Sequence, residues 1–327
     1  MQNGAENKLT RRDFVKATAA GTAAALAGSA GRLQSGQEGT LPRRMLGKTG
    51  KHVTVLGLGT APAGFRPRKE TARFYDTAIS AGVTYMDTAP EFAGYGHAQL
   101  ALGDVLRTRR EEVFLVTKCW EPDGEKALAL LKRNLAELQT DHADVVYAHS
   151  IGSDKMDLET VLGPRGVLRA LEKARRDGLC RFVGISGHNR PDKFLAVLRE
   201  FDVQVMMNAV SFVARHIYNF EELVWPVARG QDVGLVAMKV FGGMAGSGNS
   251  QKGARLTGDD CPLAFHYAMG LPGITTVVLG CYDEAELRQA IGWARGFQPL
   301  SDAESKRLTA RGRELAGQWG EVYGPVA

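Results

Sequence analysis

Short apolar runs alternate with longer amphipathic segments along most of the chain. From residue 55 onward, runs of about five residues that are apolar at nearly every position are separated by stretches in which apolar positions recur every three or four residues. Strands that are apolar on both faces are typical of a parallel sheet covered on both sides. The pattern predicts eight such strands: Val55–Gly59, Val83–Asp87, Val113–Lys118, Ala143–His149, Phe182–Ser186, Val203–Met207, Gly234–Met238 and Thr275–Leu279.

Helices are predicted in the segments between these strands. Examples are Thr71–Ser80, Glu125–Leu138, Val167–Asp177, Asp192–Glu200, Phe220–Ala228, Asp260–Met269 and Glu284–Trp293. A further polar helix, Ser301–Gln318, is expected outside the main fold. A small hairpin made of Arg44–Leu46 and His52–Val55 is expected before the first strand.

Eight strand–helix units predict a (β/α)8 TIM barrel, an α/β fold, with the N-terminal hairpin and the C-terminal helix added to it. The alternative is an open doubly wound sheet, which usually carries a glycine-rich dinucleotide loop after its first strand. The segment after the first predicted strand, residues 57–62, does not supply that loop, because Pro62 stands where the helix would begin. We therefore expect the barrel to span residues 43–327.

The first 31 residues differ from the rest. Arg11 and Arg12 are followed by Phe14 and then by a stretch rich in alanine, glycine and threonine. This segment resembles a twin-arginine export signal and is too short and too alanine-rich to span a membrane stably. Residues 32–42 are expected to form a polar linker. The protein is thus predicted to be exported in its folded state by the twin-arginine machinery and to be periplasmic or secreted.

Composition excludes several classes of protein. Apolar residues make up 44% of the chain and charged residues 24%, as in a globular protein. The net charge of +5 includes +2 from residues 1–31, and the remaining positive charges form only short pairs, so no nucleic-acid partner is expected. The four cysteines form no CxxC motif, which argues against an iron–sulfur cluster or a zinc ribbon.

Ionisable side chains stand where predicted strands end. Asp87, Lys118 and His149 close three strands, and Tyr95 follows Asp87 in the next loop. The carboxyl ends of barrel strands meet at one mouth, where TIM barrels keep their chemistry. A carboxylate, an amine, a phenol and an imidazole that converge there could form a proton relay.

Five segments carry a family resemblance. They are Gly57–Thr60, Met86–Pro90, Leu115–Lys118, Asp144–His149 and Val183–Ser186. In order and spacing they resemble the successive strand ends of the aldo-keto reductase superfamily. The resemblance implies an NAD(P)-dependent oxidoreductase that transfers a hydride between a nicotinamide cofactor and a carbonyl or alcohol substrate: an aldehyde, a ketone or a sugar. It implies catalytic roles for Asp87, Tyr95, Lys118 and His149, with Lys118 lowering the pKa of the phenol and Asp87 holding Lys118.

The position of the phenol departs from the family pattern. In the family a tyrosine follows the aspartate by five residues, and here that position is Phe92. The loop looks one residue longer than the usual form, and Tyr95, on a glycine-flanked stretch, is the candidate proton donor in its place. His97 and His188 are the alternative donors.

The cofactor side departs from the family pattern too. Gly187 stands where the family more often has asparagine, and Met238 stands where an aromatic residue usually stacks on the nicotinamide. The resemblance implies cofactor-binding roles for Thr60, Asp87, Ser186, Gly187, Met238, Lys239, Phe241, Gly280 and Cys281. It implies NADP as the cofactor. NAD stays possible, because Asp283, Glu284 and Glu286 would repel a 2′-phosphate.

Substrate contacts are expected from Trp120, Phe65, Phe92 and His188, but the sequence does not identify the substrate. Two other functions stay open. Asp87, His97, His149 and His188 could bind a divalent metal in a barrel hydrolase or isomerase, although their spacing is not that of a metal-binding motif. Alternatively, a barrel with little or no catalytic activity could bind a nicotinamide or a sugar, with Phe92 as a sign of lost chemistry.

Overall fold

The computed structural model describes residues 40–243 and 254–327. The expected export signal, residues 1–31, lies outside the described residues, as does most of the expected linker. In the described part, no helix is both long and apolar enough to cross a membrane.

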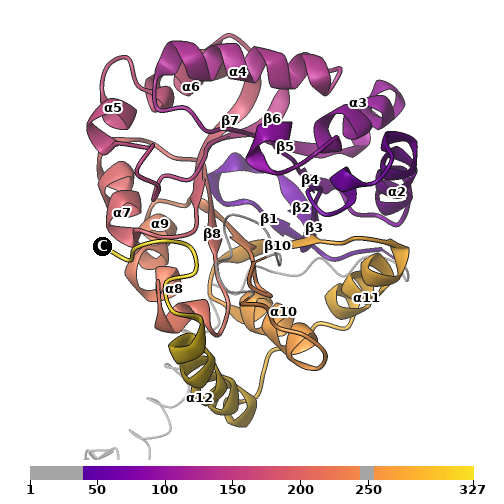
Figure 1. Ribbon diagram of the computed structural model, residues 1–327, viewed down its shortest axis with the longest axis vertical. Helices are drawn as coiled ribbons and strands as arrows, with labels where there is room; N and C mark the ends of the chain where they lie inside the picture. The colour runs from indigo at the N-terminus through magenta and orange to yellow at the C-terminus, as the bar shows by residue number, and fades with distance from the viewer. Residues whose placement is uncertain (1–39, 244–253) are drawn as a thin grey trace, which may run out of the picture.

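Eight parallel strands close into a barrel that is ringed by helices (Figure 1). Each strand pairs with the next one along the chain, and β10 closes the cylinder by pairing with β3. The strands are β3 (Leu56–Gly59), β4 (Tyr85–Asp87), β5 (Phe114–Cys119), β6 (Ala143–Ala148), β7 (Cys180–Gly187), β8 (Val205–Ala209), β9 (Gly234–Met238) and β10 (Ile274–Gly280). The predicted (β/α)8 barrel is confirmed, and the predicted strands agree with these bounds to within two residues at most ends.

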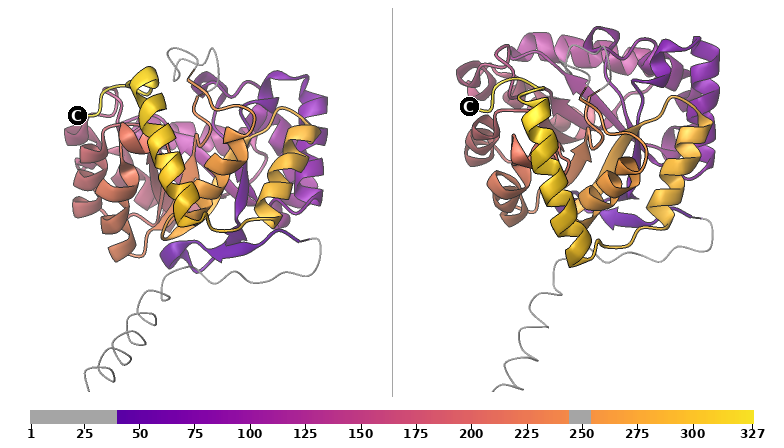
Figure 2. Two further views of the ribbon diagram at one scale, coloured as in Figure 1. Left: turned by 90° about the horizontal axis from the view of Figure 1, so that it is seen from below. Right: turned by 60° about the horizontal axis from the view of Figure 1, so that its bottom comes forward.

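The predicted hairpin seals the barrel at the end opposite the mouth. Its strands, β1 (Arg43–Met45) and β2 (His52–Thr54), are antiparallel. Leu46 and Val53 are fully buried and belong to the cluster of side chains that fills the barrel interior. Figure 2 shows the hairpin beneath the cylinder. The functional mouth is therefore at the carboxyl ends of the strands.

Two tyrosines fill the interior below the mouth. Tyr85 on β4 and Tyr147 on β6 are completely buried. Their hydroxyl oxygens are 3.0 Å apart, so each hydroxyl group has the other as its hydrogen-bond partner. Glycines make room for the rings: a Cβ atom on Gly57 would lie 2.8 Å from Tyr85 Cδ1, and one on Gly184 would lie 2.5 Å from Tyr147 Cδ1. Aromatic residues and glycines thus pack as complementary pairs in this layer.

Most of the predicted helices are present. They are α2 (Arg68–Ser80), α4 (Gly124–Glu137), α6 (Val167–Arg176), α7 (Pro191–Glu200), α10 (Asp260–Gly270), α11 (Glu284–Arg295) and α12 (Asp302–Trp319). The prediction of one helix over residues 220–228 was wrong. The structure has two short helices there, α8 (Phe220–Leu223) and α9 (Trp225–Gly230), because Pro226 lacks an N–H and begins a new helical segment.

Two further helices have bounds that the sequence pattern did not give. The longer one, α3 (Ala98–Arg109), contains Gly103, where a Cβ atom would lie 2.3 Å from the carbonyl oxygen of Glu137 at the end of α4. The glycine lets two helices approach closely, but it weakens the helical pattern in the sequence. The other, α5 (Leu158–Leu162), is only five residues long.

The C-terminal segment after α12 runs back to the mouth of the barrel (Figure 1). The Tyr218 hydroxyl donates to the carbonyl oxygen of Gly324 at 3.0 Å, and the side-chain amide of Asn189 donates to the carbonyl oxygen of Pro325 at 3.1 Å. These bonds hold the last residues against the loops that follow β7 and β8.

We predict that Gly184→Ala destabilises the protein by about 1–3 kcal/mol, because the added methyl group must displace the Tyr147 ring or the β8 backbone. The measurement is the free energy of unfolding in urea. Gly292→Ala is the matched control: it lies in the interior of α11 with no atom within 4 Å of the added Cβ. That change should stabilise the protein by up to about 1 kcal/mol, and an equal loss in both variants would contradict the packing role of Gly184.

Candidate active site at the barrel mouth

The barrel brings three of the sequence-predicted residues to one place. Asp87 ends β4, Lys118 is the penultimate residue of β5 and His149 directly follows β6. Because neighbouring strands are in register, these side chains face the interior at the same end of the cylinder. Tyr95 reaches them from the loop after β4. Gly94 and Gly96 on either side have φ angles of 82° and 52°, a region that glycine adopts readily.

Lys118 is the centre of the site. Its Nζ atom lies 2.7 Å from both carboxylate oxygens of Asp87, 2.9 Å from the carbonyl oxygen of Thr88 and 3.0 Å from the Tyr95 hydroxyl. Lys118 and Asp87 are almost completely buried. Burial disfavours the charged amine, but the Asp87 carboxylate outweighs this effect and raises the pKa of Lys118. The lysine is therefore a fixed positive charge beside the phenol.

Tyr95 stays protonated at neutral pH. Burial raises the pKa of Tyr95, and the charge of Lys118 opposes this rise only in part. The expectation that Lys118 pulls the pKa downward is correct for that one interaction, but desolvation is larger. Tyr95 follows Asp87 by eight positions rather than the five expected from the family, and the loop between them contains a short 3-10 helix, Glu91–Ala93.

Phe92, which stands at the family's tyrosine position in the sequence, is 51% exposed, and Phe65 is 64% exposed. Neither lines the cavities described below, so the structure does not bring these two predicted substrate residues to the site. His97, the alternative donor, is also exposed. Tyr95 is the phenol that the fold places beside Lys118.

His149 is held as a neutral imidazole. Its Nδ1 atom lies 2.8 Å from the Ser186 hydroxyl oxygen, while Nε2 has no hydrogen-bond partner among the described residues. Burial lowers the pKa of His149 well below its usual range, and the charge of Lys118 lowers it further. If Ser186 donates to Nδ1, then Nε2 carries the proton and can donate it in a hydrogen bond to an oxygen in the site.

A row of rings continues from His149 along the mouth. Trp120 and His188 both meet His149 edge to face, with ring centroids 6.4 and 5.8 Å away, and Tyr323 lies 5.5 Å from His188. Burial and the charge of Lys239 lower the pKa of His188 to about 3, so this ring is neutral as well. Tyr323 was not predicted from the sequence, because it reaches the site only through the fold of the C-terminal segment.

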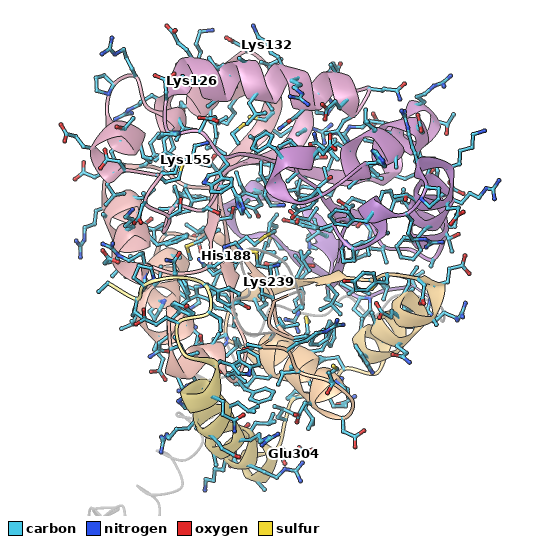
Figure 3. The ribbon with its side chains drawn as sticks, in the orientation of Figure 1. Lys126, Lys132, Lys155, His188, Lys239 and Glu304 are labelled. Atoms are coloured by element: carbon cyan, nitrogen blue, oxygen red, sulfur yellow. The ribbon has the colours of Figure 1, made fainter. Side chains whose placement is uncertain are left out.

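Lys239 is a second positive charge at the mouth. It directly follows β9 with a φ of 56°, a conformation that is uncommon for a residue with a side chain. It has no hydrogen-bond or ion-pair partner among the described residues. Figure 3 shows it near His188 in the middle of the mouth, consistent with its effect on the pKa of that ring. Burial and the charge of Lys118 lower the pKa of Lys239, so an anionic ligand that pairs with this amine would stabilise its charged form.

Two adjoining cavities open at the mouth. The first, of about 700 Å³, is bounded by Asp87, Tyr95, Met238, Lys239 and the loops after β3 and β10. The second, of about 1020 Å³, lies between the loop after β9 and α11. They share four residues: Phe241, Arg255, Leu279 and Gly280. Because they share these walls, we treat the two adjoining cavities together as one recess, which begins at the catalytic candidates.

The predicted cofactor residues divide into two groups. Asp87, Met238, Lys239, Phe241, Gly280 and Cys281 line one or both cavities. Thr60, Ser186 and Gly187 do not. The Thr60 hydroxyl donates to the backbone of Asp87, and Ser186 is bonded to His149. A Cβ atom on Gly187 would lie 2.9 Å from the Phe194 ring, which explains why asparagine is absent from this position. Arg255 lines both cavities.

A metal site is not apparent. In residues 40–243 and 254–327, no three or more histidine, cysteine, aspartate or glutamate side chains are grouped in a way that could hold a metal ion. Asp87 is instead engaged by Lys118, and His149 by Ser186. The structure therefore gives no support to the metal-dependent alternative.

Comparison with protein families decides the classification. The aldo/keto reductase family matches residues 55–262, well over half of the chain. The chain belongs to the aldo/keto reductase family. Its members are NAD(P)-dependent oxidoreductases that use NADP(H). The family resemblance carried by the five strand-end segments is thus confirmed.

Curated relatives of this aldo/keto reductase are distant. The uncharacterized oxidoreductase YqkF of Bacillus subtilis is 23% identical over 83% of this chain and 97% of its own length. L-galactose dehydrogenase of Arabidopsis thaliana is 30% identical and methylglyoxal reductase YeaE of Escherichia coli 34%, over 44% and 43% of this chain. In both cases the match spans 48% of the relative's length.

Solved structures share the fold. An aldo-keto reductase from Pseudomonas aeruginosa is 26% identical, with a TM-score of 0.62 over 77% of this chain and 94% of that one. An aldo/keto reductase from Klebsiella pneumoniae, in complex with NADP and acetate, is 20% identical, with a TM-score of 0.65 over 85% of this chain and 96% of that one. The latter likeness is one of fold.

We predict that Asp87→Asn destabilises the protein by about 3–5 kcal/mol, because it leaves the buried ammonium of Lys118 without a counter-charge. Denaturant unfolding measures the effect. Glu284→Gln is the control, since it removes one partner of an exposed pair with Arg288 and should change stability by less than about 0.5 kcal/mol. Similar losses in the two variants would show that the buried pair does not hold the mouth together.

Proposed function

We propose that this protein catalyses NAD(P)H-dependent reduction of a carbonyl group, with Tyr95 as the proton donor. The contact between the Tyr95 hydroxyl and Lys118 Nζ carries the proposal, since it places a protonated phenol beside a fixed positive charge at the edge of an open cavity. Asp87 holds the lysine from the opposite side. Phe92 therefore need not indicate lost chemistry, because another residue supplies the phenol.

The recess suits a dinucleotide cofactor. It spans two adjoining cavities, and it carries two basic side chains, Lys239 and Arg255, that have no ion-pair partner among the described residues. Gly280 in its wall packs closely against Pro62, since a Cβ atom at this position would lie 2.6 Å from the Pro62 ring. Met238 and Phe241 would border the nicotinamide end, and Lys239 and Arg255 would face the pyrophosphate. When bound, the reduced cofactor supplies a hydride to the carbonyl carbon.

The side chains at the mouth would donate the proton and stabilise the charge that remains. The Tyr95 hydroxyl gives its proton to the substrate oxygen as negative charge develops there, and the Lys118 ammonium stabilises the phenolate that remains. Asp87 acts on Lys118, keeping the amine charged and aimed at Tyr95. The Nε2–H of His149 donates a hydrogen bond to the same substrate oxygen, with Ser186 fixing the tautomer.

The substrate side is polar but uncharged. Trp120, His149, His188 and Tyr323 offer ring faces together with neutral hydrogen-bonding groups. This surface is suited to binding a small neutral carbonyl compound, such as an aldehyde, a ketone or a sugar. Relatives named for L-galactose and methylglyoxal fall within the same range of substrates.

We predict that Tyr95→Phe lowers kcat/KM for carbonyl reduction by about 10²–10⁴-fold, because the variant keeps the ring but has no proton to give. Binding of the reduced cofactor, measured by fluorescence titration, should stay within a factor of two. Phe92→Leu is the control and should leave kcat/KM nearly unchanged, since its ring is half exposed and outside the cavity. If Phe92→Leu lowered kcat/KM more than Tyr95→Phe did, Tyr95 would not be the proton donor.

The pH dependence of the reduction rate provides a second test of the same proposal. Reduction should not weaken until the pH rises through the pKa of Tyr95, above its ordinary value of about 10, because only the protonated phenol can donate. No inflection is expected near pH 6.5, since His149 and His188 are already neutral there. A reduction rate that falls between pH 6 and 8 would contradict this assignment.

We further propose that residues 1–31 direct twin-arginine export of the folded, cofactor-loaded enzyme to the periplasm or beyond. The Arg11–Arg12 pair and the small-residue stretch behind it support this proposal. Because free nicotinamide cofactor is scarce outside the cytoplasm, tight binding would let the enzyme recycle its cofactor between two substrates.

In a bacterial host with twin-arginine machinery, the full chain should accumulate in the periplasmic fraction with nucleotide bound. The double variant Arg11→Lys, Arg12→Lys should stay in the cytoplasm with unchanged reductase activity. Cell fractionation with immunoblotting measures this. Equal distribution of the two proteins would refute the export proposal and leave the reductase proposal intact.

A further inference from the structure

If the proposed function holds, the adenosine end of the cofactor would lie in the second cavity, so the charges that line this cavity bear on which cofactor binds. The first cavity contains Tyr95 and Asp87, so the reacting end of a dinucleotide must lie there if the proposed function holds. The two cavities share Phe241, Arg255 and Gly280. The remaining length of the dinucleotide can therefore continue into the second cavity, against the turn between β10 and α11.

In this turn, the chain's own carboxylates occupy the backbone donors. Asp283 Oδ1 accepts from the N–H groups of Ala285 and Glu286, both at 2.9 Å. Glu286 Oε2 accepts from the N–H of Tyr282 at 2.8 Å. A helix N-terminus with free N–H groups can bind a phosphate, but these three N–H groups already have anionic partners. These three N–H groups are therefore not free to bind a phosphate.

Two acidic side chains, Asp259 and Glu286, line the second cavity, and Arg255 is the only basic side chain of the described residues that does so. Arg255 also lines the first cavity, so it stands at the junction, where the pyrophosphate would pass. Arg288, on the next turn of α11, pairs with Glu284 instead and does not line the cavity.

These charges distinguish the two forms of the cofactor. A phosphate monoester carries a charge of about −1.5 to −2 at neutral pH, and placing it beside carboxylates without a new cation is costly. A ribose hydroxyl, by contrast, can donate a hydrogen bond to a carboxylate, as in many NAD sites. Glu286 has one carboxylate oxygen, Oε2, committed to the turn, which leaves Oε1 for such a hydroxyl.

We propose that this enzyme, unlike the NADP(H)-using members of its family, selects NAD(H), and that Glu286 is the residue that discriminates. Its carboxylate accepts a hydrogen bond from the 2′-hydroxyl of the adenosine ribose and repels a phosphate at the same position. Arg255 serves the pyrophosphate, which both cofactors share, and so contributes affinity without selectivity. The proposal rests on the proposed reductase function.

The experiment compares dissociation constants by fluorescence titration for NADH and NADPH, and by calorimetry for 5′-AMP and its 2′-phosphorylated form. The nucleotide fragments report on the adenosine cavity alone, independently of catalysis. The wild-type protein should bind NADH at least about tenfold more tightly than NADPH, and should show the same order for the fragments. Because the effect is electrostatic, the ratio should shrink as salt is raised.

Variants then test whether Glu286 causes the preference for NADH. Glu286→Gln keeps the shape and removes the charge, so binding of NADPH should improve and the NADH/NADPH ratio should fall by about tenfold or more. Glu284→Gln is the matched control: it makes the same change in charge on the same turn, but away from the cavity, and should leave the ratio unchanged. Arg255→Met should weaken both cofactors by similar factors.

The outcomes are distinguishable. Equal or tighter binding of NADPH by the wild-type protein would overturn the inference, as would an equal shift of the ratio in Glu284→Gln. So would an Arg255→Met variant that loses affinity for NADPH alone, since the arginine would then be the 2′-phosphate receptor. Failure of both dinucleotides to bind would instead remove the proposed function on which the inference rests.

Discussion

The ion pair between Lys118 and Asp87 is the interaction on which the site depends. Lys118 has three N–H bonds and four oxygen acceptors within 3.0 Å, so its ammonium is fully satisfied although it is buried. A buried charge of this kind is tolerated only when its partners are fixed. The barrel fixes them, because Asp87 and Lys118 end neighbouring strands whose register is set by backbone hydrogen bonds. Tyr95 is then held beside a permanent positive charge.

The layer beneath the pair explains why the site can be rigid. Tyr85 and Tyr147 fill the interior and satisfy each other's hydroxyl groups, and Gly57 and Gly184 give their rings the necessary space. The hairpin seals the opposite end with Leu46 and Val53. A closely packed interior allows little movement, so the polar groups above it keep their geometry without help from a ligand.

Charge is distributed unevenly around the mouth. The neutral rings of Trp120, His149 and His188 offer hydrogen bonds without a net charge. Lys239, near His188, and Arg255 border the recess that includes the second cavity. The division separates a surface suited to an uncharged substrate from one suited to a phosphate-bearing cofactor. The second cavity is also lined by the carboxylates of Asp259 and Glu286, which carry the opposite charge.

The sequence by itself determined the barrel and the strand-end residues, because burial on both faces and the positions where apolar runs stop are local properties of the chain. Asp87, Lys118 and His149 could be found in this way. The tertiary structure alone decided which phenol reaches Lys118, since Tyr95 depends on the path of a glycine-flanked loop. It also decided that Tyr323 and Arg255 join the mouth and that Phe65 and Phe92 do not. Such contacts join residues far apart in the chain, and no local pattern of polarity records how loops fold over one another.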